Sequence, residues 1–139
     1  MDAIQELMRF QTDRDLQKMD FDVINESTNI VEELLEAQGL DVSKQDRPVL
    51  KHKFLDFVKD TSDITSGIDV DTVDAFADVI VFAVGALMKM GYNPESVLLE
   101  ASKEINSRVG SMVDGKFEKD LSEVAKANWY KADYSGCKL

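Results

Sequence analysis

Two aspartates stand at the start of the most apolar stretch of the chain, Val73–Gly91. Asp74 and Asp78 are four residues apart, so on a helix they share one face. The same face continues through Val81 and Phe82, which are typical of a protein core. Because aspartate is seldom buried without a partner, we expect a cation or a set of hydrogen-bond donors to face this pair.

A second acidic group occupies residues 32–36, with the sequence EELLE. Glu33 and Glu36 are three residues apart, and Glu32 and Glu36 are four apart, so both spacings place carboxylates on one helix face. Taken alone, this pattern is also typical of a solvated acidic face, since 27 of the 139 residues are acidic. The apolar setting of the aspartate pair favours the interpretation as a site.

Four or five carboxylates converge if these two helices lie antiparallel with their acidic ends together. Two carboxylates ~4 Å apart repel by roughly 4 kcal/mol at an effective dielectric near 20. Several such pairs exceed what a small domain of ordinary stability tolerates. Either some carboxylates are protonated or a divalent cation binds among them. Ligands that are all oxygen favour Mg²⁺ first, then Mn²⁺, then Ca²⁺.

The composition argues against several classes of partner. The net charge is −11, which disfavours binding to nucleic acid or to an anionic membrane. The longest apolar run, Val79–Met88, is shorter than the roughly 20 residues that a membrane span needs. A single cysteine, Cys137, and no signal-like stretch at the start favour a reducing compartment. We therefore expect a cytoplasmic protein.

The hydrophobic periodicity is helical along most of the chain. Capping signals mark several ends: Asp22 and Asp71 as N-caps, Asn93 followed by proline as another, and glycines 39 and 91 as stops. The expected helices cover Met1–Met19, Asp22–Ala37, Val49–Lys59, Asp71–Gly91, Asn93–Gly110 and a short piece at Leu121–Ala127.

No segment shows a convincing alternation of apolar and polar residues, so no sheet is expected. The predicted fold is a single all-α domain over residues 1–139, a bundle of four or five main helices. Its core covers about 20–110, and 111–139 form a tail. The central helix is apolar enough that we expect another subunit to cover part of it, giving a homodimer or a dimer of dimers.

The two acidic motifs together resemble a known family. EELLE at 32–36, then D-A-F-A-D at 74–78 leading into an apolar run with a glycine, is similar to the MazG-like all-α nucleoside triphosphate pyrophosphatases. That superfamily includes dimeric dUTPases and phosphoribosyl-ATP pyrophosphohydrolase. The resemblance covers roughly Asn25–Lys131. It is closest to a phage and bacterial branch with an asparagine in a late helix and a DGK turn, here Asn106 and 114–116.

The resemblance implies roles for individual residues. Glu33, Glu36, Asp74 and Asp78 would be metal ligands. Glu32 would bind a further Mg²⁺ or orient the attacking water, so that Glu32 and Glu33 are the expected catalytic residues. The expected substrate contacts are Asn106 on the nucleotide and Lys116 or Lys126 on a phosphate.

The resemblance also implies a reaction, the Mg²⁺-dependent hydrolysis of a nucleoside triphosphate to the monophosphate and pyrophosphate. Asn25 and Asn29 share the polar stripe of the glutamates and are either polar surface or contacts to a base or sugar. Two alternatives stay open. One is a phosphoribosyl-ATP pyrophosphohydrolase. The other is a non-catalytic acidic helical module that uses its apolar face for dimerisation.

Overall fold

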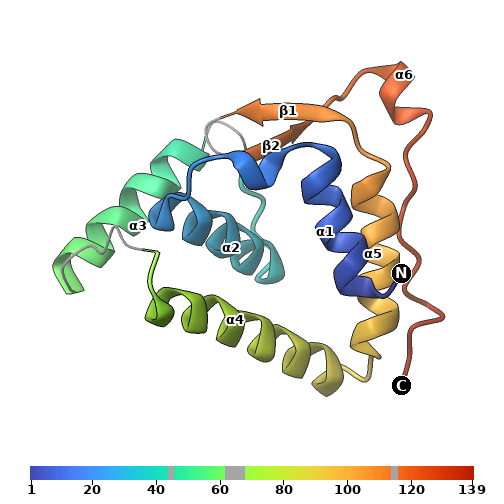
Figure 1. Cartoon of the computed structure of the whole chain (residues 1–139), viewed down its shortest axis with the longest axis horizontal. Helices are drawn as coiled ribbons and strands as arrows, with labels where there is room; N and C mark the ends of the chain where they lie inside the picture. Colours follow the sequence, from blue (N-terminus) through green and yellow to red (C-terminus); the bar gives the residue numbers. More distant parts are fainter. Residues whose placement is uncertain (44–45, 62–67, 114–115) are drawn as a thin grey trace. The chain divides into compact units, whose positions relative to one another are not determined.

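The computed structural model describes residues 1–43, 46–61, 68–113 and 116–139, and most of them are helical. The helical class predicted from the sequence is confirmed. In chain order (Figure 1) the elements are α1 (Ala3–Asp13), the 3₁₀ turn η1 (Leu16–Lys18), α2 (Val23–Ala37), α3 (Arg47–Thr61), α4 (Val70–Lys89), α5 (Pro94–Asn106), β1 (Gly110–Val113), β2 (Lys116–Lys119) and α6 (Glu123–Lys126).

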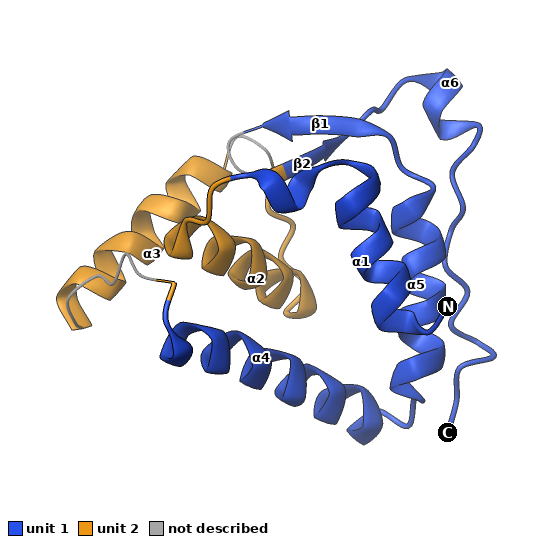
Figure 2. Cartoon of the chain, viewed as in Figure 1, with its two compact units in different colours: residues 1–19, 69–113, 117–139 blue, residues 20–68, 114–116 orange. Residues whose placement is uncertain are grey.

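The chain divides into two compact units, shown in Figure 2. Unit 1 consists of Met1–Met19, Asp69–Val113 and Phe117–Leu139. Unit 2 consists of Asp20–Ile68 and Asp114–Lys116. In unit 1, helix α1 packs along α5, and in unit 2, α2 packs along α3. Among the described residues, no helix is both long enough and apolar enough to cross a membrane.

Capping residues set the ends of α2, as the sequence predicts. The Asp22 carboxylate accepts hydrogen bonds from the backbone N–H groups of Ile24 and Asn25, which have no partner within the helix. Gly39 has a φ of 85°, a left-handed conformation that ends the helix and that glycine adopts without steric cost. The Leu40 N–H then donates to the Leu35 carbonyl, closing the last turn.

Helix α4 begins two residues earlier than predicted. Its N-cap is Asp69 rather than Asp71, because the Asp69 carboxylate accepts from both the backbone N–H and the hydroxyl of Thr72. Asp71 lies instead in the first turn, where its negative charge faces the positive end of the helix dipole. The other end agrees with the prediction, since Gly91 has a φ of 86°.

Helix α5 also starts as predicted but ends earlier. The Asn93 side chain caps it and Pro94 takes the first position. The helix stops at Asn106 rather than near Gly110, because the chain from Gly110 onward forms a strand.

The expectation that the chain has no sheet was wrong. Strands β1 and β2 pair in a two-stranded sheet. Each strand has four residues, too few for alternation to stand out in the sequence. A side chain at Gly110 would lie 1.9 Å from the carbonyl oxygen of Glu118, so this pairing requires a glycine. The predicted turn at 114–115 lies outside the described residues.

The predicted core stripe of α4 is exposed in this structure. Among the residues described, α4 has none that is buried. Val81 is 63% exposed and Phe82 is 78% exposed, and Asp74 and Asp78 are exposed as well. An apolar helix face indicates that burial is favourable but does not identify the surface that covers it, so the burial of this stripe stays a prediction.

Candidate cation site on helix α2

The EELLE segment lies in the last two turns of α2, in unit 2. Glu33 and Glu36 are both exposed, and the Glu36 side chain lies close enough to Glu33 to influence its protonation. Partial desolvation, followed by the charge of Glu36, raises the pKa of Glu33 above its ordinary value. Two carboxyls held this close form a pair of oxygen donors that a cation would stabilise.

Glu32 has a different environment, although it is the neighbouring residue. It is 4% exposed, and both of its carboxylate oxygens are bonded to cations. Oε2 accepts from Arg47 Nη1 at 3.0 Å, and Oε1 accepts from Lys116 Nζ at 2.6 Å. The predicted metal ligand or catalytic residue is therefore the centre of an ion-pair cluster in this structure.

Arg47 is the residue of this cluster that sequence reasoning missed. It is 3% exposed at the start of α3, and besides Glu32 it donates to the Asn25 side-chain oxygen at 3.1 Å. A buried guanidinium needs such partners, because an unpaired buried charge is strongly unfavourable. The sequence offered only a weak signal, the arginine before Pro48 at a predicted helix start.

The two asparagines of α2 face the same region. Asn25 is buried and accepts from Arg47, so it has a structural role in this cluster. Asn29, one turn further on, has a buried side-chain oxygen with no hydrogen-bond partner among the described residues. The predicted polar stripe through Asn25, Asn29 and Glu32 thus exists, and much of it is turned inward.

The remaining predicted site residues belong to unit 1. Asp74 and Asp78 are exposed on α4, and Lys126 is exposed at the end of α6. Asn106 uses its side-chain amide to donate to the Glu6 carbonyl at 3.2 Å. In the described ranges, no group of three or more acidic, histidine or cysteine side chains is arranged to hold a metal ion. The predicted convergence of the two acidic motifs stays a prediction.

The chemistry of the exposed pair nevertheless fits magnesium. Mg²⁺ keeps several of its waters and is commonly bound by one or two carboxylates together with substrate phosphates. Glu33 and Glu36 supply two such carboxylates on an accessible helix face. Glu33 and Glu36 are the residues of this segment that would hold the ion.

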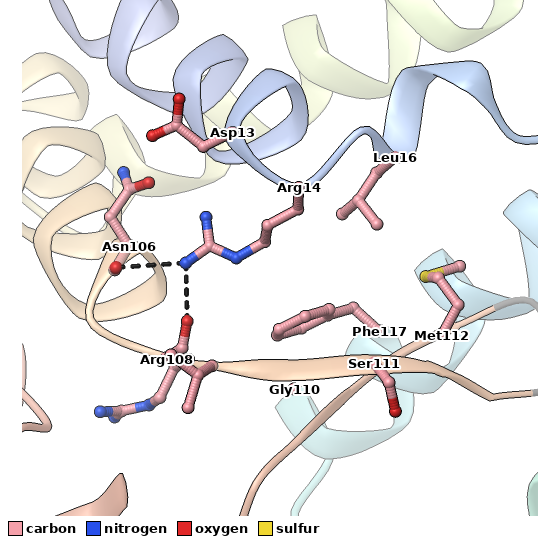
Figure 3. Close-up of a pocket in the computed structure, with 10 residues that line it drawn as sticks. Asp13, Arg14, Leu16, Asn106, Arg108, Gly110, Ser111, Met112 and Phe117 are labelled. Carbon is pink, nitrogen blue, oxygen red and sulfur yellow. Dashed lines mark hydrogen bonds between the residues drawn. The ribbon is translucent and has the colours of Figure 1, made fainter.

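A cavity of about 410 Å³ lies elsewhere, within unit 1 (Figure 3). The Arg14 guanidinium on its wall donates to the backbone carbonyls of Asn106 at 3.2 Å and Arg108 at 2.6 Å, and also to Phe10 at 3.2 Å. These carbonyls lie at or just beyond the C-terminal ends of α5 and α1, where the helix dipole is negative. Burial lowers the pKa of Arg14. The hydrogen bonds to these carbonyls satisfy the guanidinium, so Arg14 joins the ends of two helices.

The Glu33–Glu36 pair gives a pH-dependent prediction. Replacing Glu33 with Gln should stabilise the protein at pH 7 by about 0.2–0.5 kcal/mol, because it removes a like-charge pair on one helix face. The folded protein holds the Glu33 proton more tightly than the unfolded chain, so wild-type stability falls as pH rises through the raised pKa. The advantage of the variant should therefore vanish below about pH 4.

Urea denaturation at pH 7 and pH 4 checks this prediction, with Asp60→Asn as a control that removes one charge at another exposed helical position. A gain for Glu33→Gln that is the same at both pH values would contradict it.

Comparison with protein-family models, with curated proteins and with solved structures gives no match to this chain.

Proposed function

We propose that this protein is a Mg²⁺-dependent nucleoside triphosphate pyrophosphohydrolase. It would cleave an NTP or dNTP with one water to the monophosphate and pyrophosphate, in removing unwanted nucleotides or controlling a nucleotide pool. The observation that carries the proposal is the geometry of the EELLE motif. Glu33 and Glu36 form an exposed carboxyl pair, and the cations Arg47 and Lys116 flank the adjacent Glu32.

The residues of unit 2 have separable roles in this proposal. A triphosphate carries about four negative charges, so a protein with a net charge of −11 needs a cation between itself and the substrate. Bound Mg²⁺ would neutralise charge on the phosphates and acidify a bound water. Glu33 and Glu36 hold that cation. Lys116, with its side chain 30% exposed, would contact a phosphate oxygen, and Arg47 keeps Glu32 and α2 in place.

The other ligands of the proposed site are assigned by resemblance alone. Asp74 and Asp78 would complete the metal coordination, Asn106 would contact the nucleotide, and Lys126 would contact a phosphate. Mn²⁺ would replace Mg²⁺ in such an oxygen-only site, since both accept carboxylate and water ligands.

The exposed apolar side chains of α4 support an oligomer. Val73, Val81 and Phe82 are each more than 60% exposed, and monomeric soluble proteins rarely leave a large contiguous apolar patch uncovered. We propose a homodimer or a dimer of dimers in which α4 is covered. Gel filtration coupled to light scattering should give at least twice the mass of one chain, and replacing Phe82 with Glu should shift the mass to that of a monomer. A monomeric wild-type protein would contradict this part of the proposal.

A nucleotide panel tests the function itself. Purified protein is incubated with Mg²⁺ and each of the common NTPs and dNTPs, with phosphoribosyl-ATP included, and monophosphate and pyrophosphate are measured. We expect both products in equal amounts from at least one nucleoside triphosphate, and neither in the presence of EDTA. Turnover of phosphoribosyl-ATP alone would favour the alternative function, a phosphoribosyl-ATP pyrophosphohydrolase. Orthophosphate as the main product would contradict the proposed bond cleavage.

The exposed face of α4 also favours a second candidate, the non-catalytic acidic interaction module. This candidate predicts no pyrophosphate release from any nucleotide. It also predicts a melting temperature that does not depend on Mg²⁺, whereas a protein that binds the ion in its folded state melts higher as the ion concentration rises.

A further inference from the structure

The middle of helix α4 is apolar on every side. Val79, Ile80, Val81 and Phe82 are consecutive, so their side chains point in four directions around the helix axis. All four are exposed, from 40% for Val79 to 78% for Phe82. One neighbouring surface covers a stripe of roughly 100° on a helix, and a helix that is apolar all round is normally buried on more than one side. Helix α4 therefore needs more than one neighbouring surface.

The contact with α5 shows which face of α4 is already used within unit 1. Helix α4 leads directly into α5 through Gly91 (Figure 1), and near this end the side chains of Val84 and Leu87 are half-buried. These two residues are three apart and share one face. At 100° per residue, Phe82 points to the opposite side of the helix. The free face of α4 is therefore the one that carries Phe82.

Small side chains accompany Phe82 on this free face. Ala75, Val79, Phe82 and Ala86 follow at intervals of four, three and four residues, so they form one stripe, which we call the α4 seam. All four are exposed. Stripes with this spacing are the surfaces along which two helices pack, and small side chains such as alanine let the two helix axes come close.

The charges of α4 favour a second copy of the same helix in the antiparallel direction. Its charged residues are Asp71, Asp74 and Asp78 near the start and Lys89 at the end. Parallel copies would place three carboxylates beside three carboxylates. Asp71 and Lys89 are five full turns apart and flank the seam on the same side. In antiparallel copies each Lys89 therefore meets the partner's Asp71, and the two helix dipoles are opposed.

We propose that α4 packs antiparallel against α4 of a second copy of this chain, along the α4 seam. Ala75 then lies opposite the partner's Ala86, and Val79 lies opposite the partner's Phe82. The interface is isologous, with its two-fold axis between Val79 and Phe82. The inference rests on the oligomer of the proposed function, and it adds the face of α4 and the direction of the pairing.

Engineered cysteines test the direction of the pairing, in a background in which the buried Cys137 is replaced by Ala. Mild oxidation should link two chains of the double variant Ala75→Cys/Ala86→Cys, because each position 75 faces a position 86 of the partner. Within one chain these positions are ~16 Å apart along the helix, too far for a disulfide bond. Neither single variant should be linked, whereas parallel pairing would link each single variant to itself.

The double variant Val73→Cys/Val84→Cys is the matched control for the face. It has the same spacing on the opposite side of the helix, the side that carries Leu87. It should give at least about tenfold less linked dimer than the seam variant, because its positions point away from the partner helix. Linkage of the control or of a single variant, or no linkage of the seam variant, would overturn the proposal.

A measurement on the wild-type protein avoids any effect of the substitutions on folding. A carbodiimide joins an ammonium group to a carboxylate in direct contact with it, and mass spectrometry identifies the joined residues. We expect a link between Lys89 and Asp71. Within one helix these residues are ~27 Å apart, so this link can form only between two chains. The pair Lys103 and Glu100, at 2.8 Å within α5, is the positive control. A link in the control pair without one between Lys89 and Asp71 would contradict the pairing.

The outcomes separate the pairing from the rest of the proposed function. A wild-type oligomer whose seam cysteines do not link would keep the oligomer and overturn the antiparallel pairing. A monomeric wild-type protein without links would show that another part of the same chain covers the seam, which overturns the pairing as well. If the seam cysteines link two chains but no nucleotide is hydrolysed, the pairing stands and the enzymatic proposal fails.

Discussion

Replacing Glu36 with Ala is expected to reduce Mg²⁺-dependent release of pyrophosphate by at least about 100-fold, the typical loss when a group that organises transition-state charge is removed. The reason is that Glu36 supplies one of the two exposed carboxyls of the proposed cation site. The fold should survive, because Glu36 is exposed and its removal relieves repulsion on Glu33. The measurement is the initial rate of pyrophosphate formation at saturating nucleotide and Mg²⁺, together with the melting temperature without Mg²⁺.

Two further variants define the limits of this prediction. Asp60→Ala removes an exposed acidic residue from α3 and should keep wild-type activity. Asp78→Ala should be as inactive as Glu36→Ala if the assignment by resemblance is right. A Glu36→Ala protein with wild-type turnover would show that the EELLE segment is an ordinary solvated acidic face.

Replacing Arg47 with Met is expected to give the largest loss of stability, about 3–5 kcal/mol, the typical cost of removing one member of a buried ion pair. Glu32 would keep only Lys116, and Asn25 would lose the donation from Arg47. Urea or thermal denaturation in the absence of Mg²⁺ measures the change. Lys53→Met is the control, because it removes one positive charge from an exposed position of the same helix.

A double-mutant cycle distinguishes this cluster from a general effect of truncating Arg47. Adding Glu32→Gln to Arg47→Met removes the buried charge that Arg47 neutralised, so the double variant should recover a large part of the lost stability. If Arg47→Met and Lys53→Met unfold at the same urea concentration, the buried ion-pair cluster does not stabilise the fold.

Helix ends were the part of the fold that the sequence predicted best. Asp22, Asn93 and the glycines at 39 and 91 act through their own backbone and neighbouring residues, and such local effects can be recognised without a structure. The hairpin of β1 and β2 was missed for the opposite reason. Its strands are short, and they are stabilised by pairing with each other and by contacts such as that of Phe117 with Phe10, at 5.4 Å between ring centroids.

In the candidate site, too, contacts within one helix could be predicted from the sequence, and contacts with distant segments could not. The spacing of Glu33 and Glu36 was sufficient to place two carboxyls together, because both belong to one helix. The different environment of Glu32 could not be predicted, since it depends on Arg47 and Lys116, which are 15 and 84 residues away along the chain. Spacing within one helix predicts which groups are neighbours. It does not predict which of them are neutralised by other parts of the chain.

The most direct test of the account is a crystal structure of the protein grown with Mg²⁺ and a non-hydrolysable nucleoside triphosphate analogue. The account predicts a Mg²⁺ ion bound to the carboxylates of Glu33 and Glu36 and to phosphate oxygens of the analogue. An analogue bound with no metal ion at Glu33 and Glu36, or bound at a site that excludes helix α2, would contradict it.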